Sequence, residues 1–190
     1  MRRQATARWR GEGIELFLLE PADSSDTYVG WLNDPQVNQF LESRFHPQDK
    51  ASIGAFIERA LDDPNVVFFG IRSQELGCHV GNVKLGPIDR HHGLSEIGII
   101  VGDRAAWGRG IASAALRRLA EISRDELSLR KLTASCYAPN VGSLRAFEKA
   151  GFHVEGRRGR HVLLEGRPED VILLARHLEP AAPMYAERQP

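Results

Sequence analysis

The chain has 190 residues, of which 42% are hydrophobic and 26% are charged, so it is long enough to bury a sizeable core in one domain. Its 25 basic and 25 acidic residues give a formal net charge of +0, which disfavours nucleic acid or an acidic membrane as a partner. No apolar run is long enough to span a membrane, and the basic N-terminus lacks a signal-peptide core. We therefore expect a protein of the cytoplasm.

The first part of the chain predicts one strand followed by helices. Residues 1–12 are typical of a loose basic tail, and the apolar run from Ile14 to Leu19 predicts a strand that ends before Pro21. Short helices are predicted over Asp26–Leu32 and Val37–Leu41. A longer helix begins at residues 46–49 and carries one apolar stripe, formed by Ile53, Phe56, Ile57, Ala60 and Leu61.

The middle of the chain predicts strands and then a strand–helix–strand unit. Strands over Val66–Ile71, Cys78–Leu85 and Leu94–Val101 are separated by short turns, which favours an antiparallel meander. An amphipathic helix over Gly108–Glu126 precedes a strand over Lys131–Tyr137, and such units place their two strands parallel by a right-handed crossover. The expected class is therefore α+β, with a mixed central sheet flanked by helices.

The last part of the chain predicts a helix and three short strands. The helix spans Asn140–Ala150 and ends at Gly151. The strands are predicted over Phe152–Glu155, Val162–Leu164 and Val171–Leu178. We expect residues 1–178 to form a single domain, and residues 179–190, rich in Pro and Ala, to form a flexible tail.

Neither the cysteines nor the histidines show the spacing of a metal site. Cys78 and Cys136 lie in apolar, strand-like runs, so we expect both to be small core residues. No pair among the seven histidines has the spacing of zinc ligands. The sequence therefore predicts no metal.

The turn Arg104–Ala112 has the features of an anion-binding helix start. Gly108 and Gly110 leave the backbone bare where the helix begins, and the unpaired N–H groups there carry partial positive charge. A Walker loop requires a lysine that is missing here. A dinucleotide fingerprint requires an acid at the end of the next strand, where Tyr137 stands. A glycine-rich helix start without a ligand is the remaining alternative.

Two segments resemble a known family of acyltransferases. The turn is similar to the Arg/Gln-x-x-Gly-x-Gly/Ala loop of acyl-CoA N-acyltransferases, and Asn140–Phe152 is similar to their Asn-x-x-Ser…Glu-Lys-x-Gly-Phe helix. The chain thus resembles the GNAT superfamily and, within it, the RimJ/RimL-like branch. The resemblance covers Val66–Leu178 well and Tyr28–Phe45 more loosely.

The resemblance implies an N-acetyltransferase fold and acetyl-CoA as cosubstrate. The diphosphate would lie on the N–H groups of Arg109–Ala112, and the pantetheine would lie beside the strand edge at residues 99–101. Arg104 and Arg109 would add charge for phosphate, Asn140 would reach the pantetheine or sulfur end, and Trp107 would either cover the cofactor or pack the loop. The implied cofactor residues are Ile99, Ile100, Val101, Arg104, Trp107, Gly108, Arg109, Gly110, Ile111, Ala112 and Asn140.

The resemblance also implies direct attack of an amine on the thioester, with a main-chain N–H near Ile100 polarising the carbonyl. Glu96 is the candidate base, because desolvation in an apolar strand makes a carboxylate more basic; an exposed strand glutamate is the alternative. Phe147 fills the position where many relatives carry a proton-donating tyrosine. Ser143 is then the candidate acid, unless a main-chain carbonyl satisfies its hydroxyl, and Tyr137 is another candidate.

The acceptor side is expected in Tyr28–Phe45, which resembles the same stretch of acetyltransferases that act on nucleotide-linked 4-amino sugars. Trp31 and Phe40 would stack on a base or sugar and Arg44 would meet a phosphate, or the aromatics would pack in the core and Arg44 would form a surface ion pair. His161, in the basic cluster 157–161, is placed near the cleft. A small-molecule amine is the expected partner, and a homodimer stays open. The alternatives are a protein N-terminal acetyltransferase, a non-catalytic acyl-CoA-binding domain and a dinucleotide-binding oxidoreductase.

Overall fold

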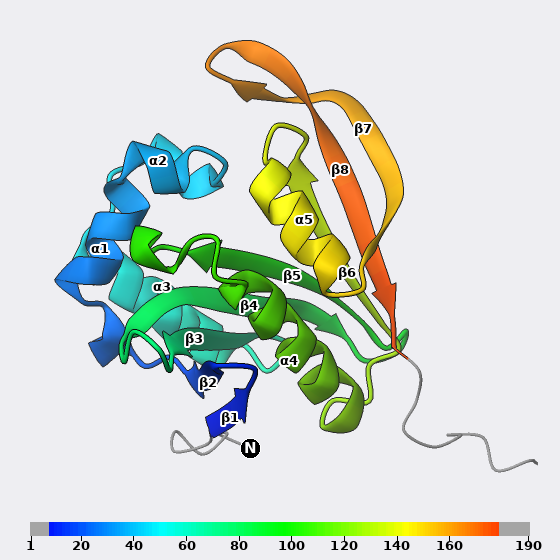
Figure 1. The fold of residues 1–190 in the computed structure, drawn as a ribbon, viewed down its shortest axis with the longest axis horizontal. Helices are drawn as coiled ribbons and strands as arrows, with labels where there is room; N and C mark the ends of the chain where they lie inside the picture. Colours follow the sequence, from blue (N-terminus) through cyan, green and yellow to red (C-terminus); the bar gives the residue numbers. More distant parts are fainter. Residues whose placement is uncertain (1–7, 179–190) are drawn as a thin grey trace, which may run out of the picture.

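The computed structural model describes residues 8–178, which form one mixed sheet of eight strands with helices against its faces (Figure 1). Strands lie side by side in the order β1-β2-β3-β4-β5-β6-β8-β7, and only β5 and β6 pair in parallel within this described part. The expected α+β class is therefore confirmed, with an antiparallel first half and a parallel pair in the middle. No helix among these residues is both long and apolar enough to cross a membrane.

The elements have the following bounds. The strands are β1 (Arg8–Gly11), β2 (Ile14–Leu18), β3 (Val67–Ser73), β4 (His79–Asp89), β5 (Leu94–Val101), β6 (Lys131–Tyr137), β7 (His153–Leu164) and β8 (Arg167–His177). The α-helices are α1 (Asp26–Asn33), α2 (Pro35–Asn38), α3 (Lys50–Asp62), α4 (Ile111–Asp125) and α5 (Val141–Lys149). The 3-10 helices are η1 (Pro21–Asp23), η2 (Glu42–Phe45) and η3 (Arg104–Ala106).

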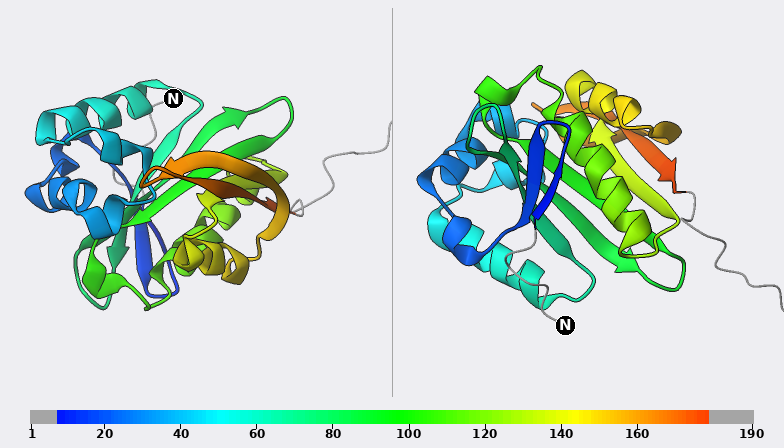
Figure 2. Two further views of the ribbon diagram at one scale, coloured as in Figure 1. Left: turned by 90° about the horizontal axis from the view of Figure 1, so that it is seen from above. Right: turned by 60° about the horizontal axis from the view of Figure 1, so that its bottom comes forward.

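The sheet separates two helical layers. Alternate side chains of a strand point to opposite faces, so Leu16 and Phe69 contribute to the cluster under α4 while the neighbouring Phe17 and Phe68 contribute to the cluster under α1 and α3. Figure 2 shows α4 crossing one face of the sheet, with α1 and α3 against the other. Residues 35–41, which we call the α2 segment, and α5 lie apart from each other above the central strands in Figure 1.

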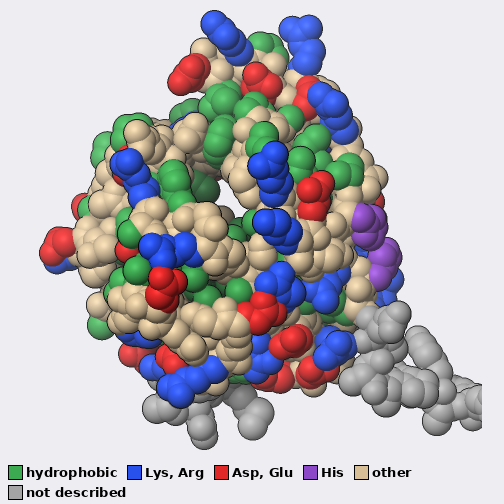
Figure 3. Space-filling model, in the orientation of Figure 1, with side chains coloured by type: hydrophobic (Ala, Val, Ile, Leu, Met, Phe, Trp, Pro, Cys, Tyr) green, Lys and Arg blue, Asp and Glu red, His purple; other side chains and the backbone are tan. Residues whose placement is uncertain are grey.

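The parallel pair β5/β6 is short, and the two strands then diverge. Their register runs only from Leu94↔Lys131 to Ile97↔Ala134. Beyond it, β6 stays paired with β8 as far as Tyr137↔Val171, while β5 stays paired with β4 as far as Val101↔Gly81. The molecule is hollowed between α2 and α5 (Figure 3). The divergence therefore exposes one main-chain edge of β5 next to a surface hollow.

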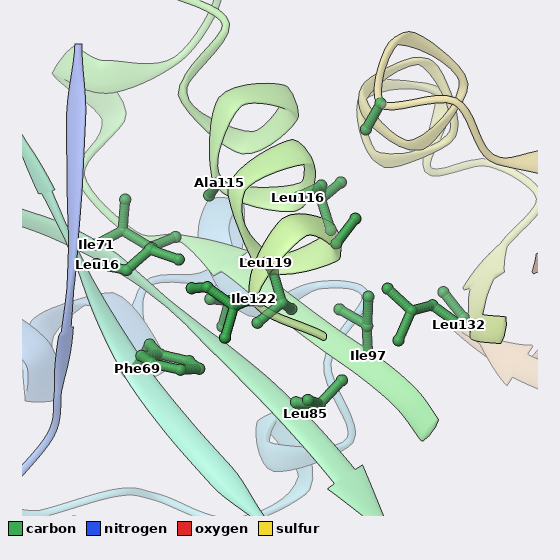
Figure 4. Close-up of a cluster of buried hydrophobic side chains, with 14 of the residues drawn as sticks. Leu16, Phe69, Ile71, Leu85, Ile97, Ala115, Leu116, Leu119, Ile122 and Leu132 are labelled. Atoms are coloured by element: carbon green, nitrogen blue, oxygen red, sulfur yellow. The ribbon is translucent and has the colours of Figure 1, made fainter. Parts of the chain in front are cut away.

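Helix α4 is held by the apolar stripe that the sequence predicts. Ile111, Ala115, Leu119 and Ile122 are all buried and belong to the largest cluster of buried side chains. Figure 4 shows Leu119 and Ile122 pointing at the sheet, toward Phe69, Leu85 and Ile97. Because each fully buried aliphatic side chain contributes about 1.5–3 kcal/mol, this packing fixes where α4 begins relative to β5.

Several boundaries differ from the prediction, chiefly in hairpins. Residues 8–11, predicted as part of a tail, form β1 and pair with β2. The two strands predicted over Phe152–Glu155 and Val162–Leu164 are one strand, β7, interrupted by shifts of register opposite β8. Strands β1 and β7 are rich in exposed charged residues. Because their main chains pair without burying one face, the spacing of apolar residues does not reveal them. Predictions for residues 1–7 and 179–190 lie outside the described residues.

The two cysteines have different environments. Cys136 is buried in β6 as expected, whereas Cys78 is exposed in the turn between β3 and β4. Strand β3 ends at Ser73 and β4 begins at His79, so Cys78 lies between the two strands. Strand β4 therefore begins one residue later than the apolar run predicts. Cys78 is therefore not a core residue.

His79 lies on the α1 side of the sheet, partly buried against aromatic rings. The centroid of its ring lies 5.3 Å from that of the Phe17 ring and 5.1 Å from that of the Trp31 ring. Its Nε2 donates to the main-chain oxygen of Gly81 at 2.9 Å and to Oδ1 of Asn82 at 2.8 Å. Desolvation lowers the pKa of His79 below its usual value of 6.5. The folded protein therefore holds this ring neutral where the unfolded chain would protonate it.

A pH-dependent loss of stability follows from His79. Below about pH 6.5 the unfolded chain binds a proton that the folded chain resists, so the free energy of unfolding should fall as the pH drops from about 7.5 to about 5. His79→Gln, which can still donate to Asn82, should flatten this dependence. Urea unfolding at the two pH values measures it, with the exposed turn residue His91→Gln as the control. An identical pH dependence in wild type and His79→Gln would contradict the prediction.

Candidate functional site

A cavity of about 440 Å³ lies at the divergence of β5 and β6. Four walls enclose it: the α2 segment, the free edge of β5, the start of α4 and one face of α5 (Figure 3). The residues on these walls are Gln36, Val37, Gln39, Phe40, Leu41, Ile99, Ile100, Val101, Ala106, Trp107, Gly108, Gly110, Ile111, Ala112, Ser113, Asn140, Gly142, Ser143, Arg145, Ala146 and Lys149. The two segments singled out by the sequence are thus two walls of one cavity.

The start of α4 presents uncovered N–H groups to this cavity. Gly110 is its N-cap at φ 76°, a left-handed conformation, and has no side chain with which to cap the helix. The first helical hydrogen bond runs from Ala114 N–H to Gly110, so the N–H groups of Ile111, Ala112 and Ser113 have no acceptor within the helix. No heavy atom lies within 4 Å of the position a Cβ would take at Gly108 or Gly110. The site is therefore open to a phosphate.

The free edge of β5 offers main-chain groups as well. Gly102 N–H donates to Val80 of β4 at 2.9 Å, and successive peptide groups of a strand point in opposite directions. The N–H and C=O of Val101, and those of Ile99 by the same alternation, therefore face the opening rather than β4. The indole of Trp107 donates to the Val101 oxygen at 2.8 Å while the ring also lines the cavity. Trp107 thus packs the loop and borders the site.

The two arginines predicted to meet phosphate do not line the cavity. Arg104 pairs with Asp34 at 3.6 Å, and Arg109 pairs with Glu75 and donates to the main-chain oxygen of Ala105 at 2.7 Å. Both acids come from distant parts of the sequence, so the motif itself could not reveal them. The structure therefore does not bring Arg104 or Arg109 into the cavity lining, and a direct phosphate role for them stays a prediction.

The charge on the cavity wall comes instead from α5, from two residues to which the sequence analysis assigned no role. Arg145 and Lys149 both line the cavity, together with Gly142 and Ala146. The spacing of these four residues is that of one helix face. That periodicity is visible in the sequence and indicates which face of the helix looks toward the turn.

Asn140 and Ser143 reach the cavity from the start of α5. Asn140 caps the helix, and its Oδ1 accepts the Ser143 N–H at 3.1 Å. The Ser143 hydroxyl has no hydrogen bond within residues 8–178, so no main-chain carbonyl satisfies it. Phe147, one turn later, is 2% exposed and packs edge-on against Phe152 at 5.0 Å. The structure therefore brings Ser143 to the cavity and leaves Phe147 in the core.

Glu96 lies just below the divergence but does not line the cavity. Its carboxylate is exposed and accepts a hydrogen bond from the Ser135 hydroxyl at 3.5 Å, across the point where β5 and β6 separate. The desolvation on which its assignment as a base relied is absent. Its position, on the same face of β5 as Gly98 and Ile100, keeps it in reach of the opening.

Among the predicted acceptor residues, the cavity includes only Phe40. Trp31 is 7% exposed, packs on Tyr28 and His79, and fills the space where a side chain at Gly102 would stand. Of the two alternatives for Trp31, the structure favours core packing, and the ring lies outside the cavity lining. His161 is exposed on β7, 3.5 Å from Arg158, and lies outside the cavity lining.

Arg44 also has a structural role. Its guanidinium donates to the main-chain oxygens of Leu41 at 2.7 Å and Leu163 at 3.1 Å, and to the Tyr137 hydroxyl at 3.2 Å. The Tyr137 phenol in turn donates to Glu42. Partial burial and this bond to a carboxylate raise the pKa of Tyr137. Arg44 is thus not free to meet a phosphate, and the proton of Tyr137 is held by Glu42 rather than offered to the cavity.

No group of three or more potential metal ligands occurs within the described residues. The arrangement that does occur is an anion site next to a free strand edge, both opening on one cavity. Such a site can hold a long phosphorylated thioester and expose its carbonyl at the strand.

A model of the acetyltransferase (GNAT) domain matches residues 14–153. The chain belongs to the GNAT acetyltransferase family. It is therefore an acyl-CoA-dependent N-acetyltransferase, in agreement with the resemblance of its two motifs. It is 40% identical over 119 residues to the probable N-acetyltransferase YjcK of Bacillus subtilis (strain 168), a match that covers 62% of this chain and just under two thirds, 65%, of YjcK.

Solved GNAT structures share the fold at low sequence identity. The spermidine N-acetyltransferase of Vibrio cholerae in complex with CoA and spermine superposes with a TM-score of 0.78 at 20% identity, covering 88% of this chain and 97% of that one. RimL, a ribosomal L7/L12 alpha-N-protein acetyltransferase in complex with coenzyme A, gives a TM-score of 0.80 at 17% identity, covering 90% and 98%. At these identities the likeness establishes the fold and leaves the acceptor open.

Proposed function

We propose that this enzyme transfers the acetyl group of acetyl-CoA to the primary amine of a small molecule by direct attack in a ternary complex. The observation that carries the proposal is that one cavity joins the open start of α4, the free edge of β5 and the α2 segment. The start of α4 suits the diphosphate, and the edge of β5 suits the pantetheine arm. The α2 segment borders the place where the acceptor enters.

In this proposal the main chain holds the cofactor. The diphosphate lies on the N–H groups of Ile111, Ala112 and Ser113, and the pantetheine amides run beside Ile99 and Val101. An N–H of that edge polarises the thioester carbonyl as charge develops on its oxygen. The carboxamide of Asn140, whose oxygen caps α5, directs its NH₂ group toward the pantetheine end.

The reaction then needs little more than positioning and two proton transfers. The amine nitrogen bonds to the carbonyl carbon, the carbon–sulfur bond breaks, and the amine loses a proton to Glu96. The thiolate gains a proton from the Ser143 hydroxyl, which regains one from water while Glu96 releases its own to solvent. Holding the amine against the thioester supplies up to about 7–11 kcal/mol of the barrier reduction. Each proton transfer adds about 10²–10⁴-fold in rate where the groups are well placed.

For the acceptor, we favour an amino sugar, in free or nucleotide-linked form. The wall formed by the α2 segment offers the ring of Phe40 and the neutral carboxamides of Gln36 and Gln39. An aromatic ring flanked by amide donors and acceptors suits a polyhydroxylated ring. Because Trp31 and Arg44 do not line the cavity, the proposed acceptor depends on Phe40, Gln36 and Gln39.

A panel of amines tests the proposed function. Purified protein is incubated with acetyl-CoA and nucleotide-linked amino sugars, free amino sugars, polyamines, aminoglycosides or short peptides, and released CoA is measured. Turnover with an amino sugar above that with polyamines and peptides supports the proposal. Preferred turnover of a peptide would replace it with protein N-terminal acetylation, and CoA binding without turnover on any amine would indicate a binding domain.

Ser143→Ala should lower kcat about 10-fold or more, because the leaving thiolate would lose its proton donor. The KM for acetyl-CoA should change less than about 2-fold, since the main-chain contacts to the cofactor remain. Steady-state kinetics with the best acceptor of the panel measure both values. Ser113→Ala, which removes a hydroxyl from another wall of the same cavity, is the control. An unchanged kcat would exclude Ser143 as the acid.

A further inference from the structure

Lys84 lies on the face of the sheet opposite α4, at the boundary between a covered and an open part of that face. Its direct neighbours across the sheet are Phe68 of β3 and Gly98 of β5. Phe68 belongs to the cluster under α1 and α3, whereas Gly98 is exposed and its Cβ position is open space. No side chain of β5 belongs to that cluster, so the cover provided by α1 and α3 ends near β4 (Figure 2). Lys84 therefore borders an open strip of the sheet at Gly98.

The ammonium of Lys84 has no acidic partner within residues 8–178. Its side chain forms no hydrogen bond or ion pair there, and Nζ lies 5.6 Å from the centroid of the ring of Phe56, an exposed residue of α3. Lys84 as a whole is half-buried, as is usual when a lysine packs its carbon stem and keeps its ammonium in solvent. This ammonium therefore has donors for an incoming group.

Gly98 lies next to both charged side chains of the open strip. Lys84 is directly opposite, and the Cα atoms of such a pair are about 4.5–5.5 Å apart. Glu96 is two residues away on the same face of β5, which is about 7 Å along the strand. The edge at Ile99, which suits the pantetheine arm, follows Gly98 directly. An amine that attacks a thioester held at this edge would therefore have a carboxylate along the strand and an ammonium across it.

We infer that Lys84 binds an anionic group of the acceptor, a carboxylate or a phosphate, and so selects amines that carry an acid close to the reacting nitrogen. The inference rests on the proposed function, because it specifies the charge of the acceptor in that site. The ammonium attracts such a group, and its N–H donors form charge-assisted hydrogen bonds to it. A second cationic amine, as in a polyamine, would meet a like charge at the same place.

Pairs of amines that differ by one acidic group test the inference. Glucosamine 6-phosphate is compared with glucosamine, and alanine with alaninamide, in steady-state assays of CoA release. Because the two amines of a pair also differ in basicity, the ratio of their kcat/KM values, anionic over neutral, is compared between the wild type and Lys84→Met. The variant keeps an unbranched stem against Phe56. Its ratio should be about 10-fold or more lower, mainly through the KM of the anionic amine.

Three further variants separate the charge of Lys84 from its packing. Lys84→Arg keeps the positive charge and should retain most of the wild-type ratio. Lys84→Glu should lower the ratio further and raise activity with a diamine above that of the wild type, because its carboxylate attracts the second ammonium. Lys50→Met, which removes a cation from the start of α3, should keep the wild-type ratio. A role in packing alone would lower kcat/KM for both amines of a pair alike and leave the ratio unchanged.

The outcomes separate this inference from the proposed function. A lower ratio in the sugar pair alone would assign the anion to a phosphate, and a lower ratio in the amino acid pair alone would assign it to a carboxylate. An unchanged ratio in both pairs would overturn the role of Lys84 and leave the acetyltransferase proposal standing. Acetylation of polyamines or peptides, with none of the paired amines accepted, would overturn it as well. Release of CoA with no amine at all would overturn both.

Discussion

Replacing Gly110 by valine is expected to lower the affinity for acetyl-CoA about 100-fold, because bonds to a charged phosphate contribute about 1.5–3 kcal/mol each. Gly110 has φ 76° at the N-cap of α4, it lines the cavity, and the position of its absent Cβ is open space. A branched side chain there would stand where the diphosphate approaches the N–H groups of the first turn. Its left-handed conformation would also cost about 1–3 kcal/mol of stability.

The control for Gly110→Val is Gly13→Val. Gly13 has φ 77°, no heavy atom lies within 4 Å of its Cβ position, and it belongs to the turn between β1 and β2, away from the cavity. Both variants should lose similar stability in thermal unfolding, since the backbone strain is the same. Only Gly110→Val should lose cofactor affinity in a calorimetric titration. Equal affinity losses in the two variants would mean that strain, rather than access to the helix start, is responsible.

The start of α4 could be predicted because its geometry is encoded locally. Gly108 and Gly110 permit the left-handed conformations that bare the backbone, and the stripe headed by Ile111 sets which face of the helix is buried. The strands on both sides, Leu94–Val101 and Lys131–Tyr137, have the predicted bounds. Every feature of this unit depends on residues within about one turn or one strand of each other.

The long side chains could not be placed from the sequence because their partners are remote. Arg44 is held by Tyr137 and Leu163, more than ninety positions away, and Arg109 is held by Glu75. The sequence around Trp31 does not show whether another element covers its ring. In the structure the ring packs into the space that the missing side chain of Gly102 leaves. A sequence motif is therefore a better guide to the main-chain groups of the cofactor site than to the cations around it.

The residues that share one face of α5 follow a pattern that the sequence does contain. Gly142, Arg145, Ala146 and Lys149 repeat at helical spacing in the same segment that indicated Asn140 and Ser143. Once one residue of a helix is assigned to a cavity, those three, four and seven positions later become candidates. Helical spacing alone therefore points to Arg145 and Lys149.

Glu96→Gln is expected to lower kcat about 100-fold near neutral pH, the size of effect that a positioned base supplies. Glu96, Gly98 and Ile100 share one face of β5, and the Cβ position of Gly98 is open space. An amine lying over Gly98 would therefore be about 7 Å along the strand from Glu96, within reach of its carboxylate directly or through one water. The exposed position of Glu96 does not remove it from this role, because the acceptor itself would displace solvent there.

The pH dependence of Glu96→Gln distinguishes a base from a residue that only shapes the site. At about pH 9.5 much more of the acceptor amine is already deprotonated, so the deficit in kcat should shrink toward wild type if Glu96 removes a proton. A shaping role would leave the deficit constant with pH. Glu155→Gln, an exposed glutamate on β7, is the control for loss of a strand carboxylate. Retention of most turnover near neutral pH would exclude Glu96, and the proton would then pass from the amine to solvent.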